Sequence, residues 1–129
     1  MPFVAASEAL NLPVADLAEI SRDLGSGAWR RPLVGSPSCR AVLLHLPPGE
    51  EPHPPHRHPR ANEVFIILRG IAAFTIGDEP EFLVGPLTVA YAPADVRHRI
   101  RVPGPEPLLF ISVVAPNLDV PDEAVDEAG

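Results

Sequence analysis

The sequence of 129 residues contains no lysine, one cysteine and no long hydrophobic run. The single cysteine, Cys39, excludes an internal disulfide and fits a reducing compartment, although a cysteine-poor secreted protein would look the same. No run reaches the ~18 apolar residues of a membrane-spanning helix. The first residues also lack the basic start and apolar stretch of a signal peptide. We therefore expect a cytoplasmic protein.

Positive charge is scarce. All ten basic residues are arginines, and the formal net charge is −7. Such a balance does not favour a nucleic acid or an acidic membrane as a partner. The missing lysine fits a genome-level codon bias, and we attach no function to it.

Proline and glycine are abundant, with 18 and 9 residues spread along the chain. Breakers at this density favour many short strands over long helices. The spacing of apolar residues predicts one short helix, over residues 14–24 and before Gly25. Strands are expected over residues 28–34, 39–46, 63–68, 72–76, 81–84, 87–92, 98–102 and 108–114. Short strands at this spacing indicate an all-β sandwich or closed barrel.

The length suits one domain with a single core. We expect an N-terminal arm over residues 1–35, a barrel over residues 36–115 and an acidic C-terminal tail over residues 116–129. The tail carries five acidic residues and no basic one, which is more typical of an arm or a frayed end than of a core.

A proline-rich segment, residues 50–61, contains a pair of histidines. Its prolines exclude a helix or a central strand, so the backbone should be extended, at the rim of the barrel. His56 and His58 are two residues apart, and in extended backbone both side chains point to the same face. Glu63 opens the next strand. A rigid surface loop and a solvated glutamate are the simpler interpretations of these features.

The strand predicted over residues 98–102 places a further histidine among apolar side chains. Arg97, Arg99 and Arg101 alternate with His98, Ile100 and Val102 in this part of the chain. The arginine face should be exposed, so His98 should point inward, where it needs a hydrogen bond or a metal. A lone inward histidine is more often a satisfied core residue than a ligand.

Taken together, these residues resemble the two motifs of the cupin superfamily. The first motif has a glycine, a His-x-His pair, a glutamate and a second glycine; here they are Gly49, His56-Arg57-His58, Glu63 and Gly70. The second motif has Pro-x-Gly-x-x-His, and here it runs from Pro93 to His98. The resemblance covers about residues 41–114, the whole predicted barrel.

Three positions depart from the motifs. Six residues separate Gly49 from His56, where the motif has five. Asp95 replaces a glycine, and aspartate is among the few other residues that tolerate a positive φ. Val102 replaces an asparagine. The four ligand positions are all present, which argues against a metal-free cupin.

The resemblance implies a small single-domain cupin with a double-stranded β-helix, or jelly-roll, barrel and a short N-terminal helix or arm. It also implies one divalent ion held by His56, His58, Glu63 and His98. Three imidazoles and a carboxylate suit Fe, Mn, Ni, Zn, Co or Cu, and the sequence does not choose among them.

The functions open to such a cupin fall into three groups. A metal-dependent enzyme acting on a small molecule, with dioxygenase-like chemistry as the first candidate, is our leading hypothesis. A non-catalytic ligand-binding or sensor protein is the second. A non-redox cyclase or isomerase is the third. Family resemblance also implies a homodimer.

Several other side chains are candidates for a substrate pocket. Phe65, Tyr91 and Phe110 lie on barrel strands, where they are core residues or line the pocket. His45 faces either the barrel interior or the opposite surface. Arg60 and Arg69 could bind a carboxylate, but exposed arginines are the simpler account. His53 is expected to be solvated.

Overall fold

The computed structural model describes residues 4–51, 54–118 and 123–124 of the chain. Within these ranges it has one helix and ten strands. The helix α1 spans Leu17–Leu24. The strands are β1 (Trp29–Ser36), β2 (Cys39–Leu46), β3 (His56–Arg57), β4 (Asn62–Arg69), β5 (Ala72–Ile76), β6 (Phe82–Val84), β7 (Thr88–Ala92), β8 (His98–Arg101), β9 (Leu108–Ala115) and β10 (Glu123–Ala124).

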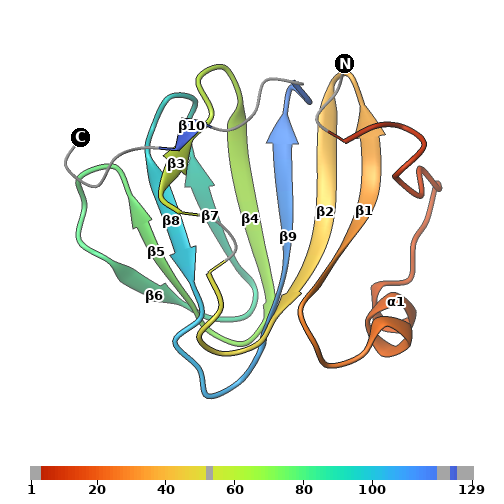
Figure 1. Cartoon of the computed structure of the whole chain (residues 1–129), viewed down its shortest axis with the longest axis horizontal. Coiled ribbons are helices and arrows are strands. Elements are labelled where there is room, and N and C mark those ends of the chain that lie inside the picture. Colours follow the sequence, from red (N-terminus) through yellow and green to blue (C-terminus); the bar gives the residue numbers. More distant parts are fainter. Residues whose placement is uncertain (1–3, 52–53, 119–122, 125–129) are drawn as a thin grey trace.

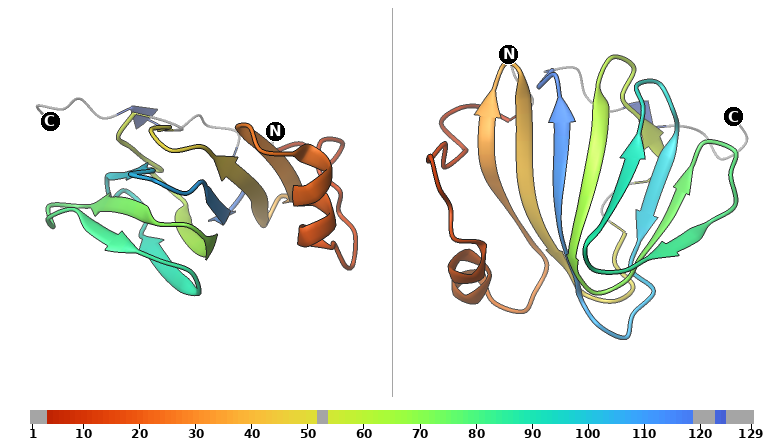
Figure 2. Two further views of the ribbon diagram at one scale, coloured as in Figure 1. Left: turned by 90° about the horizontal axis from the view of Figure 1, so that it is seen from below. Right: turned by 180° about the vertical axis from the view of Figure 1, so that it is seen from behind.

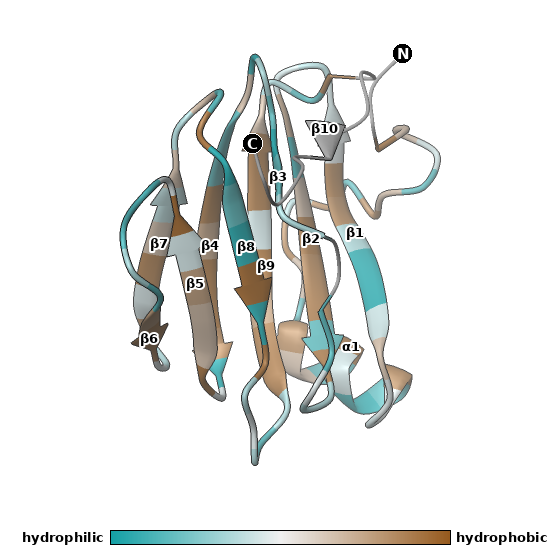
Figure 3. Ribbon diagram, turned by 60° about the vertical axis from the view of Figure 1, so that its left-hand side comes forward, coloured by the Kyte–Doolittle hydropathy of each residue, from teal (hydrophilic) through white to brown (hydrophobic). Residues whose placement is uncertain are grey.

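The strands form two five-stranded antiparallel sheets, which confirms the all-β prediction (Figure 1). One sheet has the order β1-β2-β9-β4-β7, and the other has the order β10-β3-β8-β5-β6. Phe65 on β4 and Phe74 on β5 bring the two sheets together, with ring centroids 4.9 Å apart. Both rings are buried, as is Phe110 on β9. The apolar stretches of the strands that supply this core are brown in Figure 3.

The helix lies beside β1, outside the two sheets (Figure 2). None of its residues is buried. It begins at Leu17, three residues later than predicted, because Asp16 has an extended backbone and its side chain accepts a hydrogen bond from the Glu19 amide. It ends before Gly25, as predicted, where φ is +84°. This helix, which is the one in the described residues, is not long and apolar enough to cross a membrane.

The predicted strands agree closely with the observed ones. β2 and β5 have the predicted bounds, while β1 runs on to Ser36. In the described part of the histidine- and proline-rich segment, only His56–Arg57 have strand structure and form ladder pairs, while residues 54–55 form a bend and residues 59–60 a turn. This short strand is not at an edge, however, because β8 pairs with it on one side and β10 on the other.

One residue of the predicted arm or frayed tail, Asn117, is anchored to the rest of the described structure. Asn117 is only 3% exposed, and its side chain joins the two ends of the described structure. Its Nδ2 donates to the Val4 carbonyl oxygen over 2.8 Å, and its Oδ1 accepts from the Val4 amide over 3.1 Å. Residues 119–122 and 125–129 of the predicted tail lie outside the described residues. The division at residues 35 and 115 stays a prediction, although β1 already belongs to a sheet.

We expect the substitution Asn117→Ala to lower the free energy of unfolding by about 2–3 kcal/mol. The reason is that both backbone groups of Val4, which is fully buried, would lose their hydrogen-bonding partner. Urea denaturation would measure the loss, with Ser26→Ala in an exposed loop as the control. Equal stabilities of the two variants would contradict a stabilising role for the hydrogen bonds between Asn117 and Val4.

Candidate metal centre

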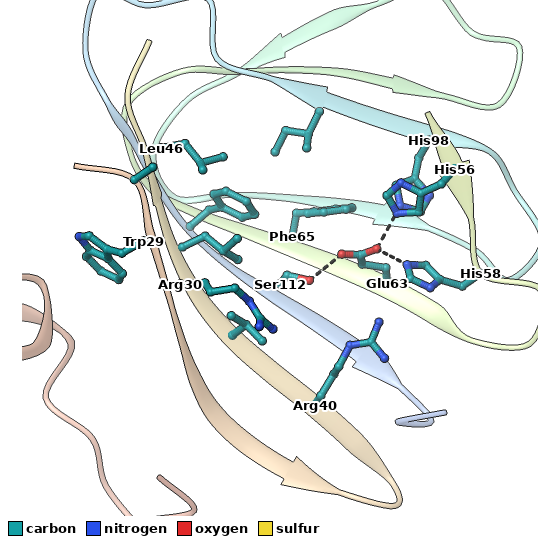
Figure 4. A pocket seen from close by; sticks show the side chains of 15 residues that line it. Trp29, Arg30, Arg40, Leu46, His56, His58, Glu63, Phe65, His98 and Ser112 are labelled. Carbon is teal, nitrogen blue, oxygen red and sulfur yellow. Dashed lines mark hydrogen bonds and ion pairs between the residues drawn. The ribbon is translucent and has the colours of Figure 1, made fainter. Parts of the chain in front are cut away.

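Four buried side chains from both sheets meet at one place in the barrel (Figure 4). His56 lies on β3, His58 directly follows that strand, Glu63 lies on β4 and His98 lies on β8. Their exposed fractions are 5%, 6%, 6% and 2%. One potential ligand atom from each residue lies within 4.8 Å of all the others. The structure therefore brings together the four residues that the sequence singled out.

The alternation of each strand explains this convergence. In β8, His98 and Ile100 are buried while Arg99 and Arg101 are half-exposed, which confirms the predicted inward face. Arg99 pairs with Glu51, and Arg101 with Glu81, on the outside. His56 pairs with His98 in the ladder between β3 and β8, so their rings lie side by side with centroids 4.5 Å apart.

The loop before β8 holds the backbone at His58, the second residue of the His-x-His pair. Asp95 has a φ of +67°, the conformation for which the motif has glycine. Its amide donates to the His58 carbonyl oxygen over 2.7 Å, and its carboxylate lies 3.4 Å from the Arg57 guanidinium. Aspartate thus meets the backbone requirement and adds an ion pair.

Glu63 is the hub of the cluster. Its Oε1 accepts from Nε2 of His58 over 2.7 Å and from Nε2 of His98 over 3.0 Å. Its Oε2 accepts from the Ser112 hydroxyl over 2.6 Å. Burial by itself raises the pKa of Glu63, but hydrogen bonds from His58 and His98, the charge of His98 and the Ser112 hydroxyl together hold that pKa far below its usual range. The carboxylate is therefore ionised at neutral pH.

The outer nitrogens of two histidines face backbone carbonyls. Nδ1 of His56 lies 3.0 Å from the Pro54 oxygen, and Nδ1 of His98 lies 3.2 Å from the Val96 oxygen. A carbonyl oxygen only accepts, so each Nδ1 is assigned the proton. This arrangement directs Nε2 to the cluster, and it is the usual outer support of a metal-binding histidine.

The cluster distances fit a metal ion. Neighbouring ligands of an octahedral ion, each bound at about 2.1 Å, lie roughly 3.0 Å apart, and opposite ones lie roughly 4.2 Å apart. The contacts of Glu63 with His58 and His98, and the 4.8 Å limit for the whole set, match these separations with small adjustments. An ion bound here would replace the contacts between histidine nitrogen and carboxylate oxygen.

A cavity of about 540 Å³ opens beside the cluster, within the usual size range of small-molecule sites. Most of its wall is apolar, and it includes Phe65 and Phe110, two of the predicted pocket residues. The full lining is Ala28, Trp29, Arg30, Arg40, Val42, Leu44, Leu46, His56, His58, Glu63, Phe65, His98, Ile100, Phe110 and Ser112.

The structure places the other two predicted pocket residues elsewhere. His45 stacks on Trp29, with centroids 5.5 Å apart, and its Nδ1 lies 2.6 Å from the Gly27 oxygen. It alternates with Leu44 and Leu46, which line the cavity, and so takes the outer face of β2. Tyr91 is 51% exposed on β7, because Ala90 and Ala92 take the inward positions. Neither is among the lining residues, and these two pocket predictions are corrected. His53 lies outside the described residues.

Three polar lining residues were missed from the sequence: Arg30, Arg40 and Ser112. Arg40 shares its strand face with Val42, Leu44 and Leu46. A charged residue at a position where the alternation predicts an apolar one was the signal that could have identified it. Arg60 and Arg69, which were considered as carboxylate binders, are not among the residues lining this cavity.

The comparisons with known proteins agree with the fold and the motifs. The cupin domain family matches residues 42–114, more than half of the chain, and the chain belongs to this family. No match was found among curated proteins.

Solved structures of similar fold include three bacterial proteins. A double-stranded β-helix protein from Klebsiella pneumoniae subsp. pneumoniae is 23% identical, with a TM-score of 0.74, and 91% of this chain and 100% of that chain are covered. The TT1209 protein from Thermus thermophilus is 28% identical, with a TM-score of 0.71 and coverage of 81% and 98%. A cupin 2 domain-containing protein from Halorhodospira halophila is 26% identical, with a TM-score of 0.68 and coverage of 80% and 73%. They support the jelly-roll fold.

Proposed function

We propose that this cupin binds one divalent transition-metal ion through His56, His58, Glu63 and His98. The observation that carries the proposal is the convergence of four buried ligand atoms within 4.8 Å, one of them on an ionised carboxylate. Burying these polar groups costs free energy unless the negative charge is balanced by a cation and the lone pairs accept a hydrogen bond or bind a metal. Hydrogen bonds also orient three of the four residues: backbone carbonyls hold His56 and His98, and the Ser112 hydroxyl holds Glu63. Such outer contacts are typical of metal ligands, and they support the proposal.

The ion serves chemistry rather than the stability of the fold. The barrel already has a continuous apolar core around Phe65, Phe74 and Phe110. Four protein ligands leave two positions of an octahedral ion, and open positions distinguish catalytic sites from closed structural ones. The cavity lies at the same place, because all four ligands are part of its wall.

We therefore propose that the protein is a metal-dependent enzyme acting on a small molecule in this cavity. A bound ion of this type supplies Lewis acidity, and iron adds O₂ chemistry. Dioxygenase-like oxidation is the first candidate. A non-redox cyclase or isomerase uses the same polarising ion without O₂, and a sensor would only bind its ligand. The homodimer and the cytoplasmic location stay predictions.

Metal content of the untagged protein tests this proposal. We expect plasma mass spectrometry to find about one transition-metal ion per chain after loading and desalting. His45→Ala is the matched control, since it removes a histidine from the outer face and should leave the stoichiometry unchanged. A native protein that holds no ion would overturn the proposal. Oxygen uptake by the iron-loaded protein with candidate substrates would then separate the oxidative chemistry from the non-redox alternative.

Metal affinity should fall as the pH is lowered from about 7 to about 5. Imidazole must lose a proton before its nitrogen can bind a metal, so protons compete with the ion more strongly as the pH falls. The lowered pKa of Glu63 keeps its carboxylate ionised throughout, so the displaced protons come from the histidines. Calorimetric titration with Ni²⁺ in buffers of different ionisation enthalpy would count those protons. An affinity that does not change with pH would contradict ligation by the histidines.

A further inference from the structure

The charged residues of the cavity differ in sign from the chain as a whole. Among the described residues that line it, the charged side chains are Arg30, Arg40 and Glu63. Two guanidinium groups and one carboxylate therefore lie in the wall of the cavity, in a protein with a formal charge of −7, and Arg40 also has a partner outside this set. A divalent ion in the metal centre would make the cavity more positive still. Such a local field favours an anionic occupant.

Arg40 is the more deeply placed of the two cations. It lies on β2 and is only 6% exposed. In the sheet Arg40 pairs with Val114, which in turn pairs with Glu63, so Arg40 and Glu63 occupy one row, two strands apart. Adjacent strands are about 4.8 Å apart, which puts the two backbones roughly 10 Å from each other. Figure 4 shows the Arg40 side chain extending from its strand into the cavity.

Arg30 marks the open side of the cavity. It lies on β1 at an exposed position, and Ala28, the lining residue just before this strand, is exposed as well. Its side chain forms no hydrogen bond or ion pair with any of the described residues. Arg30 pairs with Leu44, whose side chain also lines the cavity, so both point to the inner face of the sheet.

We propose that the cavity binds a small organic carboxylate. The carboxylate would be held by Arg40, with Arg30 at the entrance, and the apolar part would pack against Phe65, Phe110 and Leu44. A guanidinium forms two parallel hydrogen bonds with a planar carboxylate, which makes arginine the preferred partner. The row that joins Arg40 to Glu63 lets the same molecule reach the metal centre. This last point rests on the proposed metal binding, whereas the recognition by arginine does not.

The mostly apolar wall, with few hydrogen-bond donors, favours a carboxylate over a phosphate. A phosphate dianion needs many donors to replace its water, and the described wall is mostly apolar around the two guanidinium groups. A carboxylate is satisfied by one fork of donors, and the remainder of the molecule gains from apolar contact.

Paired acids and amides of equal shape test the proposal. Calorimetry of the Ni²⁺-loaded full chain would compare benzoate, phenylacetate and hexanoate with benzamide, phenylacetamide and hexanamide. We expect at least one acid to bind about 10- to 100-fold more tightly than its amide. Arg40→Gln should abolish most of this difference and leave amide binding and metal content unchanged. Arg69→Gln, an exposed arginine on β4, is the matched control.

Two results would overturn the proposal: no acid binding more tightly than its amide, or an unchanged preference in Arg40→Gln. Inorganic phosphate binding more tightly than every acid would also overturn the carboxylate assignment. If Arg40→Gln does not fold, the acid–amide comparison on the metal-free native chain decides, because no ion is then present to bind the acid, and Arg30→Gln should weaken acid binding by a smaller factor. Metal content is measured in each sample, so loss of the ion with retained acid preference identifies failure of the metal proposal alone.

Discussion

Replacing His98 by alanine is expected to weaken metal binding by more than about 100-fold, since even outer supports of metal ligands are worth 10- to 100-fold. The side chain is 2% exposed, its Nε2 faces the Glu63 carboxylate, and its Nδ1 is held by the Val96 carbonyl. Phe65, which offers no metal ligand, borders the ring at 5.7 Å between centroids. The expected readout is a metal content near zero after desalting.

The comparison with His45→Ala isolates ligation from general damage to the fold. Each substitution removes one imidazole with a backbone hydrogen bond and an aromatic neighbour, but His45 lies on the outer face. Circular dichroism and thermal unfolding of the metal-free proteins would show whether both variants fold. A folded His98→Ala protein that still binds metal with native affinity would rule out His98 as a ligand.

The second large effect is expected for Gly70→Ala, which should lower the free energy of unfolding by about 3 kcal/mol or more. Gly70 has a φ of +84°, which costs about 1–2 kcal/mol for a residue with a Cβ. A Cβ at this position would also lie 2.2 Å from the Pro107 carbonyl oxygen and 3.0 Å from its carbon. These are backbone atoms and cannot move aside without shifting the start of β9.

The control for this substitution is Gly27→Ala, because a Cβ there meets nothing within 4 Å. Its effect should stay within about 0.5 kcal/mol. Urea denaturation of the metal-free proteins would measure both, so that loss of an ion does not enter the comparison. A loss below about 1 kcal/mol in Gly70→Ala would show that the turn between β4 and β5 can rearrange. The second glycine of the first motif therefore has a steric explanation that does not involve metal chemistry.

The candidate metal centre depends on the pairing of two sheets, since no single strand holds all four residues. Glu63 and Ser112 come from one sheet, and His56 and His98 come from the other. The packing of Phe65 against Phe74 holds these sheets at the distance that the ligands need. Substitutions that loosen this core should therefore weaken metal binding without touching a ligand.

Much of this centre could be predicted from alternation and spacing. The parity of residues 97–102 predicted that His98 points inward, and the two-residue spacing predicted a common face for His56 and His58. The positive φ of Asp95 was also indicated by the sequence, because the motif has glycine at this position. These are local properties of an extended chain, in which side chains alternate with a period of two.

The features that the sequence did not predict depend on contacts between distant parts of the chain. Alternation divided β2 into two faces, but it did not tell which face, that of Arg40 or that of His45, lines the cavity. The strand pairs with β1 and β9, and only the curvature of the whole sheet decides which side encloses space. In the same way, Asn117 follows the last long strand in a polar segment, and its burial depends on the distant Val4.

The sequence by itself determined the class of fold, the four residues of the candidate metal centre and the glycine that its first motif requires. All of these depend on strand periodicity, turn chemistry and motif spacing, which are properties of residues close together in the chain. Only the tertiary structure decided that Arg30, Arg40 and Ser112 face the same cavity and that His45 and Tyr91 do not. The physical reason is that inside and outside exist for a strand only after two sheets have closed over a common core.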